Sequence, residues 1–360
     1  GAFAGLFGLS FGVTQLFMGV GMDLYGLRKT VLTAFPLAIV GSVVSALAPS
    51  YHGLMLGQLL IGIGCAPAFL ACTMFISRHF PTERFAFMSG VAMGVGGLGL
   101  LFTGTPLAWL VQHYGWRTGF GLLAVLCALS WLAIFWRVHE PHLASDERPK
   151  PSWMESFKGF GALFLVPHTW AIVIMGMVGY ASFLTVRGLW LSPMLIDRYG
   201  FSLVATGNVA LAVSVISLFT PSVWGKFDPG AARRGGRVIF GAGAMACIFC
   251  ALGWVHGALA TVALIMLMGL VSGYVVLLYA YVRSSYPTET TGRALSVYTM
   301  ALFLGAALMQ WLSGIVAAYA QSHGGEVYEY VMFFVAGMLV TGCVAFRFLP
   351  SSPLLAAQER

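Results

Sequence analysis

Arg187 is the only charged residue of this 360-residue sequence that lies deep inside a long apolar run. A buried guanidinium is costly unless it faces a cavity or a polar partner, so an arginine in this setting marks a candidate binding site. Its planar N–H groups match the oxygens of carboxylates and phosphates. We therefore expect Arg187 to bind an anion. Two other interpretations are open: the side chain extends to a polar interface, or it bonds structurally to carbonyl groups at a helix end.

The acidic residues offer no obvious partner for this arginine. All twelve Asp and Glu residues and all eight His residues fall in loops or at the ends of apolar runs. A cationic substrate would require a buried carboxylate, and a proton relay would require buried titratable groups. A buried cation without a fixed counter-ion instead favours an anionic ligand that neutralises it.

Polar and aromatic residues within the apolar runs are the candidates to complete such a site, although each is equally suited to packing. They are Gln15, Gln58, Tyr180, Trp190, Asn208, Tyr274, Tyr279, Tyr298 and Gln310. The sequence has no glycine-rich phosphate loop, no Ser/His/Asp triad and no His cluster with metal-ligand spacing. We therefore expect no enzyme activity, no metal and no cofactor.

The elements that must position these residues are helices in a membrane. The sequence is 59% hydrophobic and only 9% charged, far below the charge of a soluble domain. Eleven continuous apolar runs, each near the length of about 20 residues that spans a bilayer, predict an all-α polytopic membrane protein and disfavour a β-barrel. The runs are 1–20, 30–48, 53–77, 85–110, 118–137, 168–192, 203–224, 237–255, 259–282, 293–319 and 328–348.

The distribution of Lys and Arg predicts the orientation. If the first run ends in the cytoplasm, all but three of the 19 basic residues fall on that side or in the tail, the exceptions being Arg117, Arg198 and Arg187. The positive-inside rule then places the central linker and the C-terminus in the cytoplasm, in an inner membrane. The asymmetry also accounts for the net charge of +7 without a nucleic-acid partner.

The longest polar stretch divides the chain into two membrane halves. We expect a first bundle over 1–138, a cytoplasmic linker over 139–167 with a short interfacial helix near Trp153–Phe160, a second bundle over 168–350 and a cytoplasmic tail over 351–360.

An internal repeat relates the two halves. Pro81-Thr82-Glu83 recurs as Pro287-Thr288-Glu289, 206 residues later, and Arg28 maps to Arg234 at the same offset. Parallel repeats joined by a long linker are typical of transporters. The same offset places the counterpart of run 168–192 before residue 1. We therefore expect an N-terminally truncated chain of a twelve-helix protein.

A loop between the first two runs resembles the signature loop of the major facilitator superfamily. Its residues are Gly19, Asp23, Gly26, Arg28 and Lys29, in the spacing GVGMDLYGLRK. The resemblance implies two six-helix bundles, here with the first helix missing. Gly19 permits a close helix approach, Gly26 permits a tight turn, and Asp23 is expected to pair with Arg28 and Lys29 as a conformational latch.

The second half carries a degraded copy of this loop. Asp228 follows Gly225 by three residues rather than four, and Ala232 stands at the repeat position of Gly26. Two family patterns are also absent: Gln58 replaces the arginine of many proton-coupled members, and GVAMGVGGLGLLFTGTP lacks the Gly-Pro pair of drug antiporters.

More loosely, GLWLSPML and TGTPLAWLVQHYGWRTGF are similar to stretches of the sugar-phosphate-permease-like and organic-anion branches. Arg187 before Ser192-Pro193 resembles the organophosphate antiporters, with a slightly shorter spacing.

Together these features predict a monomeric secondary transporter that moves a small organic anion by alternating access, with a coupling ion left open. The alternatives are efflux of amphipathic drugs and, in a different class, a polytopic membrane protein that does not transport.

Overall fold

The computed structural model describes residues 2–103, 105–138 and 153–358, which form helices joined by short turns with no strand among them. Within these ranges, eleven helical segments are long and apolar enough to cross a membrane. The expected all-α polytopic fold is therefore confirmed. In chain order the elements are α1 (Ala2–Tyr25), α2 (Leu27–Ala34), α3 (Pro36–Leu47), α4 (Tyr51–His79), α5 (Thr82–Phe102), α6 (Thr105–Tyr114), α7 (Trp116–Arg137), α8 (Trp153–Leu165), α9 (Pro167–Thr185), the π-helical turn η2 (Val186–Trp190), α10 (Leu191–Tyr199), α11 (Leu203–Lys226), α12 (Ala231–Trp254), α13 (Ala258–Val271), the 3₁₀ turn η3 (Ser272–Tyr274), α14 (Val275–Ser285), α15 (Thr288–Ser322), α16 (Val327–Phe348) and α17 (Pro353–Gln358).

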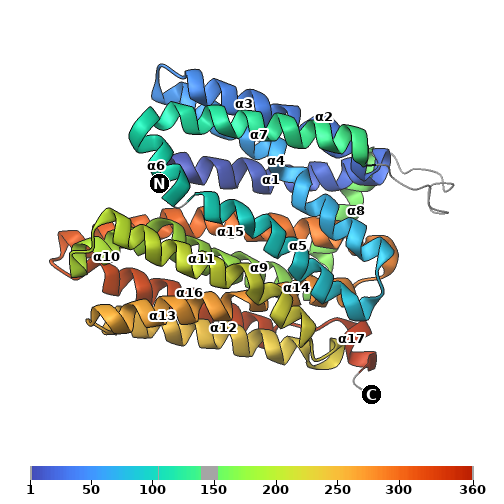
Figure 1. The fold of residues 1–360 in the computed structure, drawn as a ribbon. Helices are drawn as coiled ribbons and strands as arrows, with labels where there is room; N and C mark the ends of the chain where they lie inside the picture. The colour runs from blue at the N-terminus through green and yellow to red at the C-terminus, as the bar shows by residue number, and fades with distance from the viewer. Residues whose placement is uncertain (1, 104, 139–152, 359–360) are drawn as a thin grey trace.

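The helices lie side by side, with α2, α3 and α7 at the top of the view in Figure 1, α12, α13 and α16 at the bottom, and α5 at the level of α15 and α11 between them. The helices α1–α7 precede α8 in the chain and α9–α16 follow it. We call these the first half and the second half. The halves meet where α1 packs against α15 and where α5 packs against α11. We call the end of the bundle that holds α8 the linker end and the opposite end, which holds α6 and α10, the far end.

Local sequence signals set where the helices begin and end. An apolar run in lipid must satisfy its backbone internally, which a helix does. Gly26 breaks α1 from α2 with a φ of +86°, a conformation that favours glycine. Pro36 opens α3 at its first turn, where its missing N–H costs nothing. Ser50 and Ser202 accept hydrogen bonds from backbone N–H groups at the starts of α4 and α11.

Glycines allow the halves to approach closely between α5 and α11. A Cβ on Gly94 would lie 2.7 Å from the carbonyl oxygen of Leu218, and one on Gly90 would lie 2.5 Å from that of Pro221. Small residues at such crossings bring helix backbones together within a membrane. The glycine-rich stretch of α5 therefore forms an interface between the halves.

Several predicted boundaries differ from the structure, and two of the differences lie next to Arg187 and its contacts. The run 85–110 is divided into α5, which ends at Phe102, and a separate α6 that begins at Thr105; Pro106 lies in the first turn of α6, where proline favours a new helix. The run 168–192 extends to Tyr199 through the π turn η2.

The linker and the tail also contain helices. The short helix expected near residues 153–160 is present as α8 and extends to Leu165. The tail contains α17. The part of the predicted linker over 139–152 and the last two tail residues, 359–360, lie outside the described residues.

Candidate functional site

Arg187 lies in the π turn η2, where α9 passes into α10. The N–H of Leu191 donates to the carbonyl oxygen of Val186, the five-residue step that defines a π bulge and often accompanies a functional position. The Nε and Nη2 groups of Arg187 donate to the Ser214 hydroxyl on α11 at 3.2 and 2.7 Å. Nη2 also donates to the Leu100 carbonyl oxygen of α5 at 3.4 Å. The guanidinium therefore sits between the halves.

The charge of Arg187 is met by neutral acceptors. Among the described residues, no carboxylate forms an ion pair with it. Leu100 lies in the last turn of α5, where carbonyl groups lack helical partners and carry partial negative charge. The bond to the Leu100 carbonyl oxygen supports the helix-end interpretation of this arginine. The lack of an ion pair among the described residues leaves the anion-binding interpretation open.

Aromatic residues flank Arg187 along the chain on α9 and η2, and both contact α15. Tyr180, two turns earlier on α9, contacts the ring of Phe303 at 6.3 Å between centroids, and Phe303 contacts Phe11 of the first half at 3.9 Å. The indole N–H of Trp190 donates to the Ser313 hydroxyl at 3.0 Å. Of the predicted site residues, Tyr180 and Trp190 are therefore the ones nearest to Arg187 along the same helix.

The other predicted site residues are placed differently. Tyr274 and Tyr298 are fully buried, and the Tyr298 hydroxyl donates to the Val275 carbonyl oxygen at 3.5 Å. Gln58 on α4 is half-buried and Asn208 on α11 is exposed, and neither bonds to another described residue. The two tyrosines pack as core residues, while the two amides keep hydrogen-bonding capacity to spare.

A second aromatic contact joins the halves closer to the linker end. Tyr279 of α14, itself buried, packs edge to face on Phe69 of α4 at 5.5 Å and on Tyr298 at 4.7 Å between centroids. Residues from α4, α14 and α15 thus meet in one aromatic cluster between the halves.

Several residues around Arg187 had no detectable signal in the sequence. Ser214 is one of many small hydroxyl residues in apolar runs, and Leu100 contributes a backbone carbonyl, which every residue has. Phe303 could have been found only by placing α15 beside α9, since aromatic residues are common in these helices.

The predicted latch loop makes its ion pair across the halves. Asp23 pairs with Arg293 of α15, with Arg293 Nε 3.2 Å from Asp23 Oδ2. This differs from the expected pairing within the loop, because α1 packs against α15 and brings Arg293 to the acid. Arg28 instead donates to the Phe135 carbonyl oxygen at 2.7 Å, and the Lys29 side chain is exposed.

Gly19 and Gly26 have the geometry that the loop pattern predicted. A Cβ on Gly19 would approach the ring of Phe160 to 2.9 Å and would clash with Ser296, so α1 can pack against α8 and α15 only with glycine here. Gly26 has a positive φ at the start of α2.

The second-half loop retains this geometry although its sequence appeared degraded. Gly230, and not Ala232, is the structural counterpart of Gly26: their φ/ψ values are 85°/167° and 86°/167°. The prediction that Ala232 occupies the position of Gly26 was wrong. The segment from Gly225 to Gly230 is two residues shorter than the segment from Gly19 to Gly26. Asp228 pairs with the buried Arg234, whose Nε lies 3.0 Å from Asp228 Oδ1.

Arg283 makes a further contact between the halves at the linker end. Its Nη2 donates to the carbonyl oxygens of Ser77 and Phe80 at 3.0 and 2.8 Å, and its guanidinium lies over the ring of Phe85 at 4.7 Å. An arginine of α14 therefore caps the C-terminal end of α4 in the other half.

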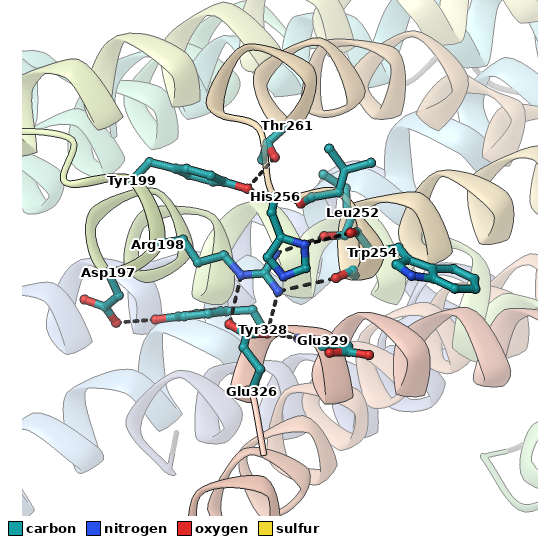
Figure 2. A network of polar contacts seen from close by, with 12 residues as sticks. Asp197, Arg198, Tyr199, Leu252, Trp254, His256, Thr261, Glu326, Tyr328 and Glu329 are labelled. Carbon is teal, nitrogen blue, oxygen red and sulfur yellow. Dashed lines mark hydrogen bonds and ion pairs between the residues drawn. The ribbon is translucent and has the colours of Figure 1, made fainter. Parts of the chain in front are cut away.

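A polar network fastens the far end of the second half (Figure 2). Arg198 of α10 forms an ion pair with Glu326 and donates to the Leu252 carbonyl oxygen at 3.1 Å. The Tyr328 hydroxyl donates to Asp197. These bonds tie α10 to α12 and α16 within the second half.

Within this network, Glu326 lies outside the membrane-spanning segments and has a shifted pKa. Burial alone would raise its pKa, but the bonds from Arg198 and from the Glu329 backbone N–H outweigh burial, so the pKa of Glu326 lies below its ordinary value.

The fold and these sites define a polytopic helical membrane protein whose two halves are tied to each other at both ends. The family model described as the Major Facilitator Superfamily matches residues 1–260. The chain belongs to the major facilitator superfamily, as the latch loop predicted.

Comparisons with individual proteins agree with this family. The chain is 31% identical to the gallate transporter of Pseudomonas putida over 134 residues, which cover 36% of this chain and 29% of that protein. It is 29% identical over 131 residues to the mouse solute carrier family 2 facilitated glucose transporter member 10, covering 34% of this chain and 23% of that protein. The match thus spans about a quarter of the length of these relatives.

A solved structure shares the fold over nearly the whole chain. The human organic anion transporter MFSD10 superposes with a TM-score of 0.75 at 15% identity, covering 95% of this chain and 83% of that one. At this identity the likeness concerns the fold alone.

Proposed function

We propose that this chain acts as a secondary transporter that moves a small organic anion across a membrane by alternating access. The observation that carries the proposal is Arg187, a half-buried guanidinium between the halves with no ion-pair partner among the described carboxylates. Membership of the superfamily supports the transport mode.

The substrate class rests on the arginine and not on the relatives, since the two curated relatives differ in the substrates that their names give. A half-buried charge that is met only by a hydroxyl and a carbonyl is poorly compensated. No described residue accepts a bond from Nη1 of Arg187, so this nitrogen can donate to a carboxylate or phosphate oxygen. Binding an anion there would neutralise the charge and form charge-assisted hydrogen bonds.

The contacts between the halves support alternating access. In a rocking mechanism, the linker end and the far end open in turn around a central site. The Asp23–Arg293 pair is suited to close the linker end, with Gly19 and Gly26 shaping the latch and Arg28 and Lys29 extending its basic surface. We place the linker end and the C-terminus in the cytoplasm from the charge asymmetry.

Uptake by proteoliposomes tests the proposal. Radiolabelled benzoate and glycerol 3-phosphate represent a carboxylate and a phosphate ester. Arg187→Gln should lower uptake of the transported anion by about tenfold or more, because a charge-assisted bond contributes roughly 1.5–3 kcal/mol. The matched control is Arg117→Gln, since Arg117 also donates to a helix-end carbonyl at the far end, that of Ala48, but within one half.

The control variant should keep uptake within about twofold of the wild type. Folding of each variant is checked by thermal unfolding and gel filtration. If neither anion is taken up, or if Arg187→Gln transports normally, the organic-anion proposal fails. Protection of cells against amphipathic drugs by the same chain would then favour efflux.

A further inference from the structure

Arg187 does more than line a site, because it also connects the halves. It belongs to η2 of the second half, and the Leu100 carbonyl oxygen that it contacts ends α5 of the first half. Ser214, its other acceptor, lies on α11 in the same half as the arginine. The contact with Leu100 is therefore the one bond of this guanidinium, among the described residues, that crosses between the halves.

The Leu100 carbonyl oxygen has the chemistry of a weak substitute for an anion. It lies in the last turn of α5, at the negative end of the helix dipole. It already accepts a bond from the Thr103 hydroxyl at 2.8 Å. Its distance of 3.4 Å from Arg187 Nη2 is longer than the roughly 2.7–2.9 Å of a strong charge-assisted bond. An oxyanion would therefore outcompete it for the same N–H group.

Ser214 determines which N–H groups of Arg187 are left to bind either an anion or the Leu100 carbonyl oxygen. The serine hydroxyl accepts from both Nε and Nη2 and donates to the Ala210 carbonyl oxygen at 2.6 Å. One edge of the guanidinium is thus held on α11. Among the described residues, the one acceptor from the other half is the Leu100 carbonyl oxygen, which Nη2 contacts, while Nη1 has no acceptor.

We propose that the bond from Arg187 to the Leu100 carbonyl is a tie between the halves at the far end, and that the anionic substrate releases this tie by taking its place on the guanidinium. The inference rests on the proposed function and adds to it the way in which substrate binding is coupled to movement of the halves. A ligand shifts a conformational equilibrium only by a differential interaction. Here the difference is the carbonyl contact, which is present without the anion and absent with it.

A pair of spin labels at the far end measures this coupling. Phe102→Cys at the end of α5 and Val204→Cys at the start of α11 are both exposed and lie in different halves. The labels are placed in a chain whose six native cysteines are replaced by Ser, reconstituted in nanodiscs. Distances are recorded by double electron–electron resonance without anion and with saturating benzoate or glycerol 3-phosphate, and binding is measured separately by calorimetry.

In the wild-type background, the anion that binds should lengthen the mean distance by about 2 Å or more, the scale of helix shifts at interfaces. Arg187→Gln should show the longer distance without anion and no response to it. Arg117→Gln should behave like the wild type, because its carbonyl contact lies within the first half.

Each outcome decides between the two proposals. If an anion binds and the distance does not change, the tie is refuted while the transport proposal stands. If Arg187→Gln without anion has the wild-type distance, the carbonyl contact does not hold the halves and the tie is again refuted. If neither anion binds, both proposals fail. The wild-type titration gives its result even if the Arg187 variant does not fold.

Discussion

Asp23 and Arg293 lie 270 residues apart in the sequence, yet their side chains form an ion pair at the linker end. The acid belongs to the loop pattern that identifies the superfamily, and the base belongs to the opposite half. Both side chains are about one-fifth exposed, so water screens the pair only in part. The bond must break whenever the two halves separate at this end.

A double-mutant cycle should detect this pair. We expect Asp23→Asn and Arg293→Gln to show a coupling energy of about 1 kcal/mol in thermal unfolding, at the upper end for partly exposed pairs. The same cycle between Asp23→Asn and Arg84→Gln, an exposed linker-end arginine, should give none. Equal coupling in the two cycles would show that Asp23 responds to general surface charge.

The loss of Arg283 should weaken closure at the linker end. Arg283→Gln removes the bonds to the carbonyls of Ser77 and Phe80, and we expect a loss of roughly 1.5–3 kcal/mol in unfolding free energy. Arg233→Gln, at an exposed position of α12, should change it by less than about 0.5 kcal/mol. Similar stability of both variants would argue against a capping role for Arg283.

Gly26 and Gly230 should be equally sensitive to substitution. Because both residues have φ near +85° and ψ near 167°, a region essentially restricted to glycine, Gly26→Ala and Gly230→Ala should each cost about 1–3 kcal/mol. Gly236→Ala, at an open helical position of α12, should be neutral or stabilising. A large cost at Gly26 with none at Gly230 would contradict the structural equivalence of the two loops.

The Arg198–Glu326 network should show a defined pH dependence. Because the folded pKa of Glu326 lies below its ordinary value, the ionised carboxylate stabilises the fold above the unfolded pKa of about 4.3, and this stabilisation is lost as the pH falls through the folded value. The difference in melting temperature between wild type and Glu326→Gln should therefore be present at pH 6 and shrink below about pH 4. A constant difference over this range would exclude titration of Glu326 as its cause.

The membrane helices were predictable because their signal is local. A segment such as Val327–Phe348 is apolar along its whole length, and lipid leaves such a segment no alternative to helix. Predicted boundaries failed where the backbone changes pitch or direction. Neither the π turn at Val186–Trp190 nor the break after Phe102 carries a hydropathy signal.

The candidate site was predictable only at its charged centre. Arg187 is conspicuous because a cation in an apolar run is rare. Its acceptors, Ser214 and the Leu100 carbonyl, are chemically ordinary, and only the packing of α5 and α11 beside η2 brings them to the guanidinium. Tyr274 and Tyr298 also had the residue types expected of a binding site, and the packing of second-half helices around them buries both fully.

The sequence by itself determined that this chain is a helical membrane protein, which loop marks its family and which cation is out of place in lipid, since each of these follows from the polarity and spacing of neighbouring residues. The tertiary structure alone decided the partners: Arg293 for Asp23, the end of α4 for Arg283, and the end of α5 for Arg187. These contacts join residues of different halves, and their formation depends on how rigid helices pack across the interface, which is not encoded in any single segment.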